Sequence, residues 1–215
     1  MVTGTTHDML EYNRFIHGAP NKKIAETRYN KYIKWRKQNF PLSEHDPCFG
    51  NGMPEFIKFS SIVEVPGVRN AFFYSARIDR YEFTPHQYTL AIANCIQTNL
   101  PRDSQDAVNI FVDIRPRDGW PNVKVINMLH VLKCIAGTIT HFYPGRLNKL
   151  YVFSTPTFAA AIWNIIKPVL DPVVASKVKL IAGYSSDTAP LPGALKKVMS
   201  EALIKDMTDI RSKLM

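Results

Sequence analysis

From residue 71 onward, short apolar runs alternate with longer segments of helical character, and this alternation restricts the chain to few folds. The apolar runs span residues 71–78, 109–115, 149–154 and 177–183, and the helical segments span 84–99, 121–142, 157–170 and 191–215. Nearly continuous apolar strands are typical of a parallel sheet that is covered on both faces by right-handed crossover helices. The sequence therefore predicts an α/β fold with a mostly parallel sheet as its floor.

The first third of the chain has a different character. Residues 5–39 predict two helices, and residues 41–70 are rich in proline and glycine, which favours an irregular linker. We expect three parts: a helical region at 1–40, a linker at 41–70 and the main domain at 71–215. The second predicted helix carries a run of lysines and arginines between Lys22 and Lys37. These residues form either a solvent-exposed helix face or a surface that binds an anionic membrane.

The segment 157–170 is unusually apolar, because only Asn164 and Lys167 are clearly polar. A helix that is apolar all round is buried or faces something other than water. The helix predicted at 121–142 also carries more apolar surface than one core-facing stripe needs. We therefore expect flanking helices that enclose an apolar pocket. Its predicted lining is Tyr74, Phe111, Trp120, Met128, Ile135, Ile139, Tyr151, Phe153, Phe158, Ile162, Trp163 and Ile166.

Signatures of catalysis and metal binding are missing from the sequence. It has no G-x-S-x-G elbow, no phosphate-binding glycine loop and no H-E-x-x-H pair. Asp113 at a strand end and Ser185 in a turn remain remote catalytic candidates. The cysteines Cys48, Cys95 and Cys134 are widely spaced, which argues against a zinc site or a disulfide framework and fits a reducing compartment. We expect a protein that is not an enzyme and has no metal.

The charge of the chain favours anionic partners. It has 27 basic and 18 acidic residues, a formal net charge of +9. No nucleic-acid recognition motif accompanies this charge, so we expect no nucleic-acid partner. The first residues lack the apolar core of a signal peptide, and no apolar run reaches transmembrane length. We expect a cytoplasmic protein that contacts anionic membranes peripherally.

Four short motifs resemble a known family. They are Tyr143–Leu147 (YPGRL), Leu150–Phe153 (LYVF), Ile165–Pro172 (IIKPVLDP) and Ser176–Val178 (SKV), with Ser154-Thr155-Pro156 at the position of an N-x-P motif. Together they resemble the signature of the CRAL-TRIO domain. This is the fold of the yeast-type phosphatidylinositol/phosphatidylcholine transfer proteins and of the tocopherol and retinaldehyde carriers.

The resemblance implies a lipid-binding module whose only bound ligand is a lipid. The sheet would form the floor of the pocket, and the helix at 157–170 would be a mobile gate that opens at membranes. Phosphatidylinositol binders of the family have a glutamate where Gly145 stands and a threonine where Val174 stands, whereas Lys177 is retained as a headgroup candidate. The resemblance thus predicts lipid exchange between membranes. The alternative is a membrane or protein adaptor that keeps the fold with a vestigial pocket.

Overall fold

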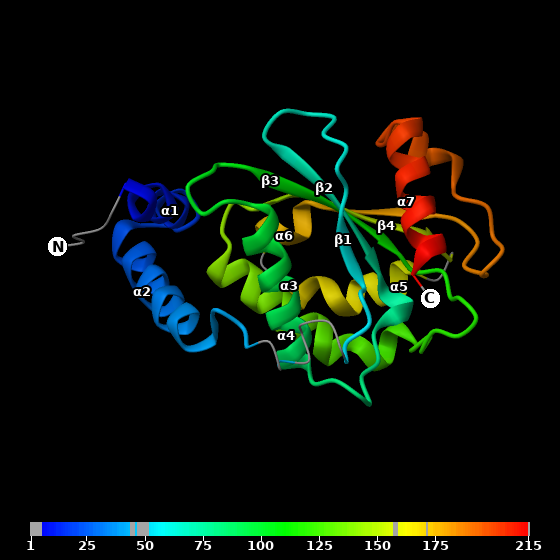
Figure 1. Ribbon diagram of the computed structural model, residues 1–215, viewed down its shortest axis with the longest axis horizontal. Helices are drawn as coiled ribbons and strands as arrows, with labels where there is room; N and C mark the ends of the chain where they lie inside the picture. The colour runs from blue at the N-terminus through cyan, green and yellow to red at the C-terminus, as the bar shows by residue number, and fades with distance from the viewer. Residues whose placement is uncertain (1–5, 44–45, 47–51, 157–158, 171, 215) are drawn as a thin grey trace.

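The computed structural model describes residues 6–43, 46, 52–156, 159–170 and 172–214, and a five-stranded sheet lies at its centre (Figure 1). The strands are β1 (Ile57–Phe59), β2 (Val68–Tyr74), β3 (Ala107–Asp113), β4 (Leu147–Thr155) and β5 (Val178–Ala182). The helices are α1 (Thr6–His17), α2 (Lys22–Asn39), α3 (Pro85–Asn99), α4 (Leu129–Phe142), α5 (Ala159–Ile166), α6 (Pro172–Ser176) and α7 (Glu201–Lys213).

The strands lie in the order β1-β2-β3-β4-β5, so each strand pairs with the next one in the chain. The pairs from β2 to β5 are parallel, and only β1 is antiparallel to its neighbour. The mixed α/β fold with a mostly parallel sheet is therefore confirmed. α3 begins with a capping box, in which the Thr84 hydroxyl accepts a hydrogen bond from the Gln87 amide and the Gln87 side chain accepts one from the Thr84 amide.

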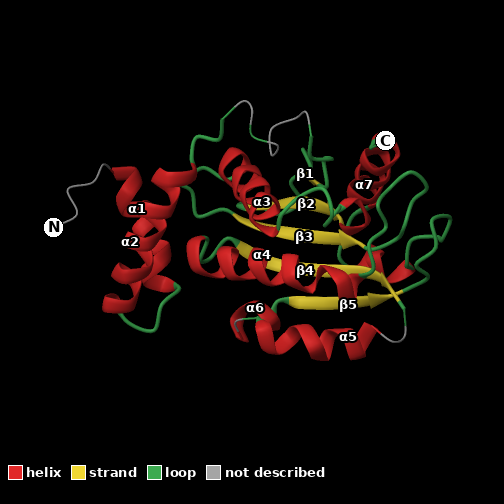
Figure 2. Cartoon of the chain, turned by 90° about the horizontal axis from the view of Figure 1, so that it is seen from below, coloured by secondary structure: helices red, strands yellow, loops and turns green. Residues whose placement is uncertain are grey.

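The register assigns strand residues to two faces of the sheet by strict alternation. One face carries Ala71, Phe73, Val108, Ile110 and Val112, which pack against α3 and α4. The opposite face carries Phe72, Tyr74, Phe111, Tyr151 and Phe153. This second face is covered by α7 and the short 3₁₀ helix Gly193–Lys197. Figure 2 shows α3 and α4 in front of the sheet and α5 beyond its β5 edge.

The helices α1 and α2 form a hairpin at one end of the molecule, beside α4 (Figures 1 and 2). Phe15, Tyr29 and Tyr32 form its aromatic core. Trp35 of α2 stacks on Phe142, the last residue of α4, with ring centroids 4.7 Å apart. The hairpin is thus packed directly on a helix of the main domain.

Several predicted boundaries differ from the structure. The segment 41–70, expected to be irregular, contains β1 and the start of β2. The segment 75–78, expected to continue a strand, is instead a 3₁₀ turn at Ser75–Arg77. The helix expected from residue 121 begins at Leu129, after a 3₁₀ turn, because the Asn122 side chain bonds Arg117 and Trp120 and prolongs the preceding turn.

The closing helix also starts later than expected. It begins at Glu201, where the Ser200 hydroxyl accepts a hydrogen bond from the Leu203 amide and caps the helix. The segment 157–170, expected to be one helix, splits into α5 and a 3₁₀ turn at Lys167–Val169, and Thr157 and Phe158 lie outside the described residues.

Candidate functional site

An apolar groove opens between the α5–α6 segment and β5. Its volume is about 660 Å³, which lies within the range of small-molecule pockets. Lys167 and Ser176 are its polar lining residues. The apolar lining residues are Trp163, Pro168, Leu170, Pro172, Ala175 and Val178. The groove therefore offers an open apolar surface with few polar groups.

The α5 helix is only loosely covered by the rest of the protein. Trp163 is half-buried in the groove, whereas the Ile165 side chain is 54% exposed. Val173 in α6 is 63% exposed. A segment that leaves large apolar side chains in water has little packing to hold it closed, and its apolar residues suit a lipid or a bilayer better than water.

The helix α4 and the β4–β5 part of the sheet lie beside this segment. Figures 1 and 2 place α4 and α5 on the same side of the sheet. Leu132, Ile135 and Ile139 of α4 are only partly buried against the core. On the same face of the sheet, Val152 pairs with Leu180, which is 36% exposed. The apolar surface thus continues from the groove toward α4.

Lys177 immediately precedes β5 and lies between the groove residues Ser176 and Val178 in the sequence. Its ammonium donates a hydrogen bond to the backbone oxygen of Leu147. Burial lowers the pKa of Lys177, and the nearby Lys149 lowers it further. Among the described residues, no carboxylate forms an ion pair with either lysine. The two lysines therefore make a positively charged corner at this edge of the sheet.

The motif Tyr143–Leu147 fixes the turn between α4 and β4. Gly145 has φ of 78°, a left-handed conformation that favours glycine. Arg146 is 2% exposed and donates hydrogen bonds to the backbone oxygens of Leu100, Pro101, Ser104 and Asp106. Its buried guanidinium thus holds the loop between α3 and β3, and burial lowers the pKa of Arg146 to about 10.

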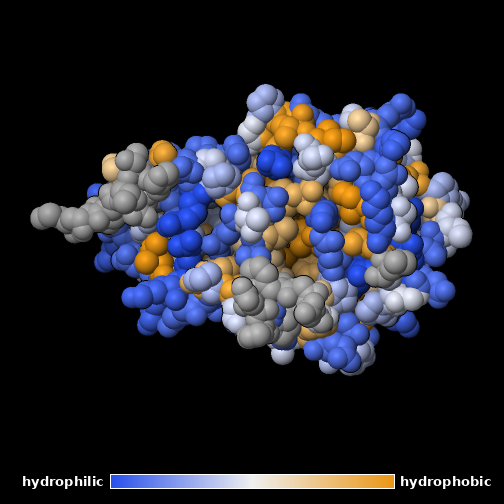
Figure 3. Space-filling model, in the orientation of Figure 1, coloured by the Kyte–Doolittle hydropathy of each residue, from blue (hydrophilic) through white to orange (hydrophobic). Residues whose placement is uncertain are grey.

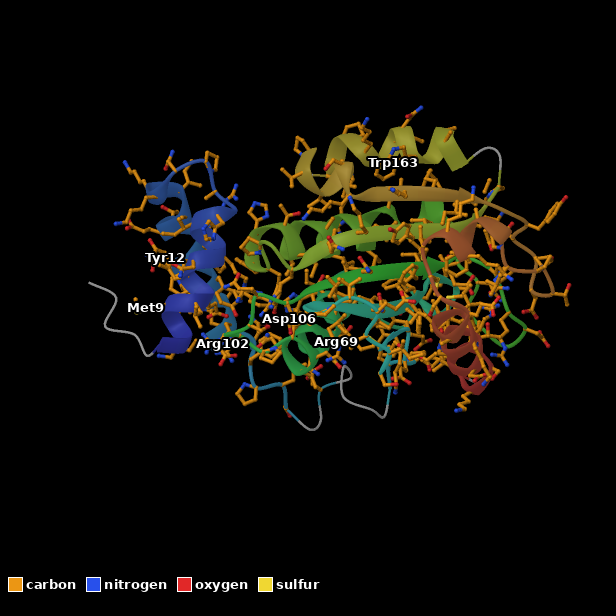
Figure 4. The ribbon with its side chains drawn as sticks, turned by 90° about the horizontal axis from the view of Figure 1, so that it is seen from above. Met9, Tyr12, Arg69, Arg102, Asp106 and Trp163 are labelled. Atoms are coloured by element: carbon orange, nitrogen blue, oxygen red, sulfur yellow. The ribbon has the colours of Figure 1, made fainter. Side chains whose placement is uncertain are left out.

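The structure divides the twelve predicted lining residues between two faces of the sheet. Met128, Ile135 and Ile139 lie on the α4 side, and Trp163 lies in the groove (Figure 4). Tyr74, Phe111, Trp120, Tyr151 and Phe153 pack under α7 on the opposite face. Phe158 lies outside the described residues, as do the side chains of Ile162 and Ile166. The described members of the set therefore do not surround one cavity.

The groove residues that sequence reasoning missed are Pro168, Leu170, Pro172, Ala175 and Val178. The sequence does contain an indication of these residues, because all of them lie in or between the IIKPVLDP and SKV motifs. On the strands, the alternation of side chains would have separated Val152 and Leu180 from Tyr151 and Phe153.

The charged residues near α7 form a structural cluster. Asp113 is 1% exposed and pairs with Arg115 at 2.7 Å and with Arg211 at 3.3 Å. The guanidinium groups of Arg77, Arg117 and Arg211 lie 4.8–5.5 Å from the centre of a Trp120 ring. The Asp113 carboxylate is therefore occupied in holding α7 against the sheet.

Within the ranges that the structure describes, no helix is both long and apolar enough to cross a bilayer. Among those same residues, no group of three or more histidine, cysteine, aspartate or glutamate side chains is placed to hold a metal ion.

This chain matches a family model, a curated protein and solved structures, among them that of Sfh5. The family model described as "CRAL/TRIO domain" matches residues 72–206. The CRAL-TRIO domain-containing protein YKL091C of Saccharomyces cerevisiae is 32% identical over 62 residues, which cover 27% of this chain and 20% of that protein. The crystal structure of Sfh5 superposes with a TM-score of 0.64 at 12% identity, covering 83% of this chain and 65% of that one. The chain thus matches about a fifth of the curated relative and just under two thirds of the solved structure.

Proposed function

Because the chain belongs to the CRAL/TRIO domain family, as its motifs predicted, we propose that it binds a hydrophobic lipid in the groove beside α5 and exchanges it between membranes. The family generally binds small lipophilic ligands. The observation that carries the proposal is the apolar groove of about 660 Å³ beside a loosely covered helix. Binding would come from acyl-chain burial, at about 0.8 kcal/mol per methylene group.

In this proposal the segment 157–170 is the gate. Ile165 and Val173 already present apolar side chains to the outside, as a segment that docks on a bilayer requires. Lys167 lies between α5 and α6, where its ammonium can remain at the lipid headgroups while the apolar residues enter the bilayer. The protein would then act as a peripheral membrane protein. No chemical step is needed, and the ligand leaves unchanged.

The identity of the headgroup is a separate part of the proposal. Lys149 lies two residues before Tyr151 and so belongs to the α7 face of the sheet. Lys177, which lies between two groove residues in the sequence, suits a phosphate, since no described carboxylate neutralises it. Gly145 and Val174 supply no polar side chain there. We therefore propose a lipid with a simple phosphate-bearing headgroup rather than an inositol that needs several hydrogen-bond partners.

The experiment compares a groove-filling variant with a matched control. Ala175 is buried and lines the groove, whereas Ala202 lies on the exposed side of α7. Native mass spectrometry, lipid extraction and transfer between vesicles are measured for the wild type, Ala175→Trp and Ala202→Trp. We expect lipid on the wild type and the control, and at least a tenfold loss of bound lipid and transfer in Ala175→Trp.

The outcomes separate the proposal from its alternative. A wild type that yields no lipid and transfers none would instead favour the adaptor, with a vestigial pocket. Equal amounts of bound lipid in Ala175→Trp and Ala202→Trp would show that the lipid binds outside this groove. The mass of the recovered lipid shows whether its headgroup carries a phosphate.

A further inference from the structure

The outward side of α2 is a surface of unpaired lysines. Lys23, Lys31, Lys34 and Lys37 are all exposed and lie opposite the buried side chains of this helix. We call these four residues the lysine face. In the part of the chain that the structure describes, none of them forms an ion pair. The carboxylate of α2, Glu26, instead accepts a hydrogen bond from the Tyr12 hydroxyl. Lysines three and four positions apart on a helix repel each other. An anionic partner that binds the lysine face would relieve this repulsion.

The lysine face is fixed to the main domain by a buried ionic cluster. Glu11 of α1 is fully buried and accepts hydrogen bonds from Arg102 and from the Tyr32 hydroxyl, the latter at 2.7 Å. Arg14 donates to the backbone oxygens of Arg102 and Ser104. Figure 4 shows Arg102 between the α1 end and the main domain. The hairpin therefore cannot turn independently while this cluster is intact.

The position of α2 relates the lysine face to the groove. Trp35, on the inner side of α2, stacks on Phe142 at the end of α4, the helix on the groove side of the sheet. In Figures 2 and 4, the turn between α1 and α2 points to the same side of the molecule as α5 and α6. The start of the lysine face is thus on the side where the groove opens.

The surroundings of the lysine face match a flat anionic surface. The α1–α2 end of the molecule is largely hydrophilic in Figure 3. Ile24 and Ile33, which are 37% and 36% exposed, border the face, and Met9 on α1 is 60% exposed. Isolated apolar side chains beside lysines suit the headgroup region of a bilayer, where the stems of the lysines can also be buried.

We propose that the lysine face of α2 binds the anionic surface of a bilayer and orients the molecule so that the groove meets the membrane. This inference rests on the proposed lipid exchange. It adds a second membrane contact, electrostatic and remote from α5, that selects the membrane by its charge. Each lysine held near an anionic leaflet adds about fivefold to the affinity, and salt screens this effect.

The test uses the full chain and two variants with the same change in charge. In the first, all four residues of the lysine face are changed to glutamine. In the control, Lys196, Lys197, Lys205 and Lys213 near α7 are changed to glutamine; all four are exposed. Binding is measured by flotation with vesicles of phosphatidylcholine alone and of phosphatidylcholine with a minority of phosphatidylserine. Far-ultraviolet circular dichroism and thermal melting check that both variants fold.

We expect the lysine-face variant to lose two to three orders of magnitude in affinity for the anionic vesicles at low salt, and the control to lose less than about threefold. Lipid uptake from neutral vesicles should be the same in all three proteins, so it tests the proposed exchange independently. Equal losses in both variants would show a general effect of net charge and overturn the inference. Tighter binding of the lysine face to RNA than to anionic vesicles would overturn it as well.

Discussion

At the scale of single residues, Ser154 is unusual because both its backbone conformation and the burial of its hydroxyl are energetically unfavourable. It has φ of 60°, is fully buried, and its hydroxyl has no hydrogen-bond partner. The left-handed conformation costs a non-glycine residue about 1–2 kcal/mol, and a buried unpaired hydroxyl costs about 1–3 kcal/mol. The strain falls where β4 shifts register against β5, a few residues before α5.

We therefore predict that Ser154→Gly stabilises the protein by about 1 kcal/mol, since the greater backbone freedom of glycine in the unfolded chain offsets part of the gain. Urea unfolding measures the difference. Ser154→Ala is the control, because it removes the hydroxyl and keeps the strained Cβ, and it should gain less than Ser154→Gly. A clear loss of stability in Ser154→Gly would mean that the hydroxyl has a partner that stabilises the fold.

At the scale of elements, the hairpin α1–α2 depends on Glu11. The carboxylate of Glu11 compensates the charge of Arg102 and of the buried Arg14. Removing one partner of a buried ion pair leaves the other uncompensated, which costs about 3–5 kcal/mol. Because the Arg102 side chain is 30% exposed, we take the lower end of this range.

We predict that Glu11→Gln destabilises the attachment of the hairpin by about 3 kcal/mol, whereas the matched control Glu26→Gln on the exposed side of α2 costs less than about 0.5 kcal/mol. Hydrogen exchange should show faster opening of residues 6–39 in Glu11→Gln, with unchanged protection of β3. If α1, α2 and β3 lost protection equally, the hairpin would be part of the same cooperative unit as the sheet.

The elements themselves were largely predictable from the sequence, because the apolar runs of β3 and β4 are long and bounded by turn residues. β1 was missed because it has three residues, of which Lys58 is exposed and paired with Glu55. The candidate site was predicted less well. Aromatic strand residues indicate burial but not the face, so the sequence predicts Phe111 and Tyr151 in one pocket with residues of α4, whereas α7 covers them. Tertiary packing decides which helix covers each face of the sheet, and a local sequence pattern does not predict it.

At the scale of the whole molecule, burial holds several acidic groups in their protonated form. Burial raises the pKa of Tyr32, Tyr74 and Tyr143, and it raises the pKa of Tyr88 and of Cys95 to about 12 each. In the unfolded chain the cysteine loses its proton near pH 9 and the tyrosines lose theirs near pH 10. The folded state therefore binds more protons than the unfolded state above pH 9. Arg146 opposes this trend by one proton between about pH 10 and 12.5, because its pKa is lowered on folding.

We predict that the contribution of these groups to the free energy of unfolding is constant below about pH 8.5 and is lost as the pH rises from 9 toward 12. Each group contributes a slope of about 1.4 kcal/mol per pH unit once its unfolded form titrates, so the net loss at pH 10.5, after the opposing effect of Arg146, is about 4 kcal/mol. Urea unfolding at several pH values measures it. Cys95→Ala should flatten the curve between pH 8.5 and 9.5, where the tyrosines do not yet titrate. A stability that stays level from pH 8 to pH 10.5 would contradict the prediction, and it would mean that the buried tyrosines gain water or cationic partners as the pH rises.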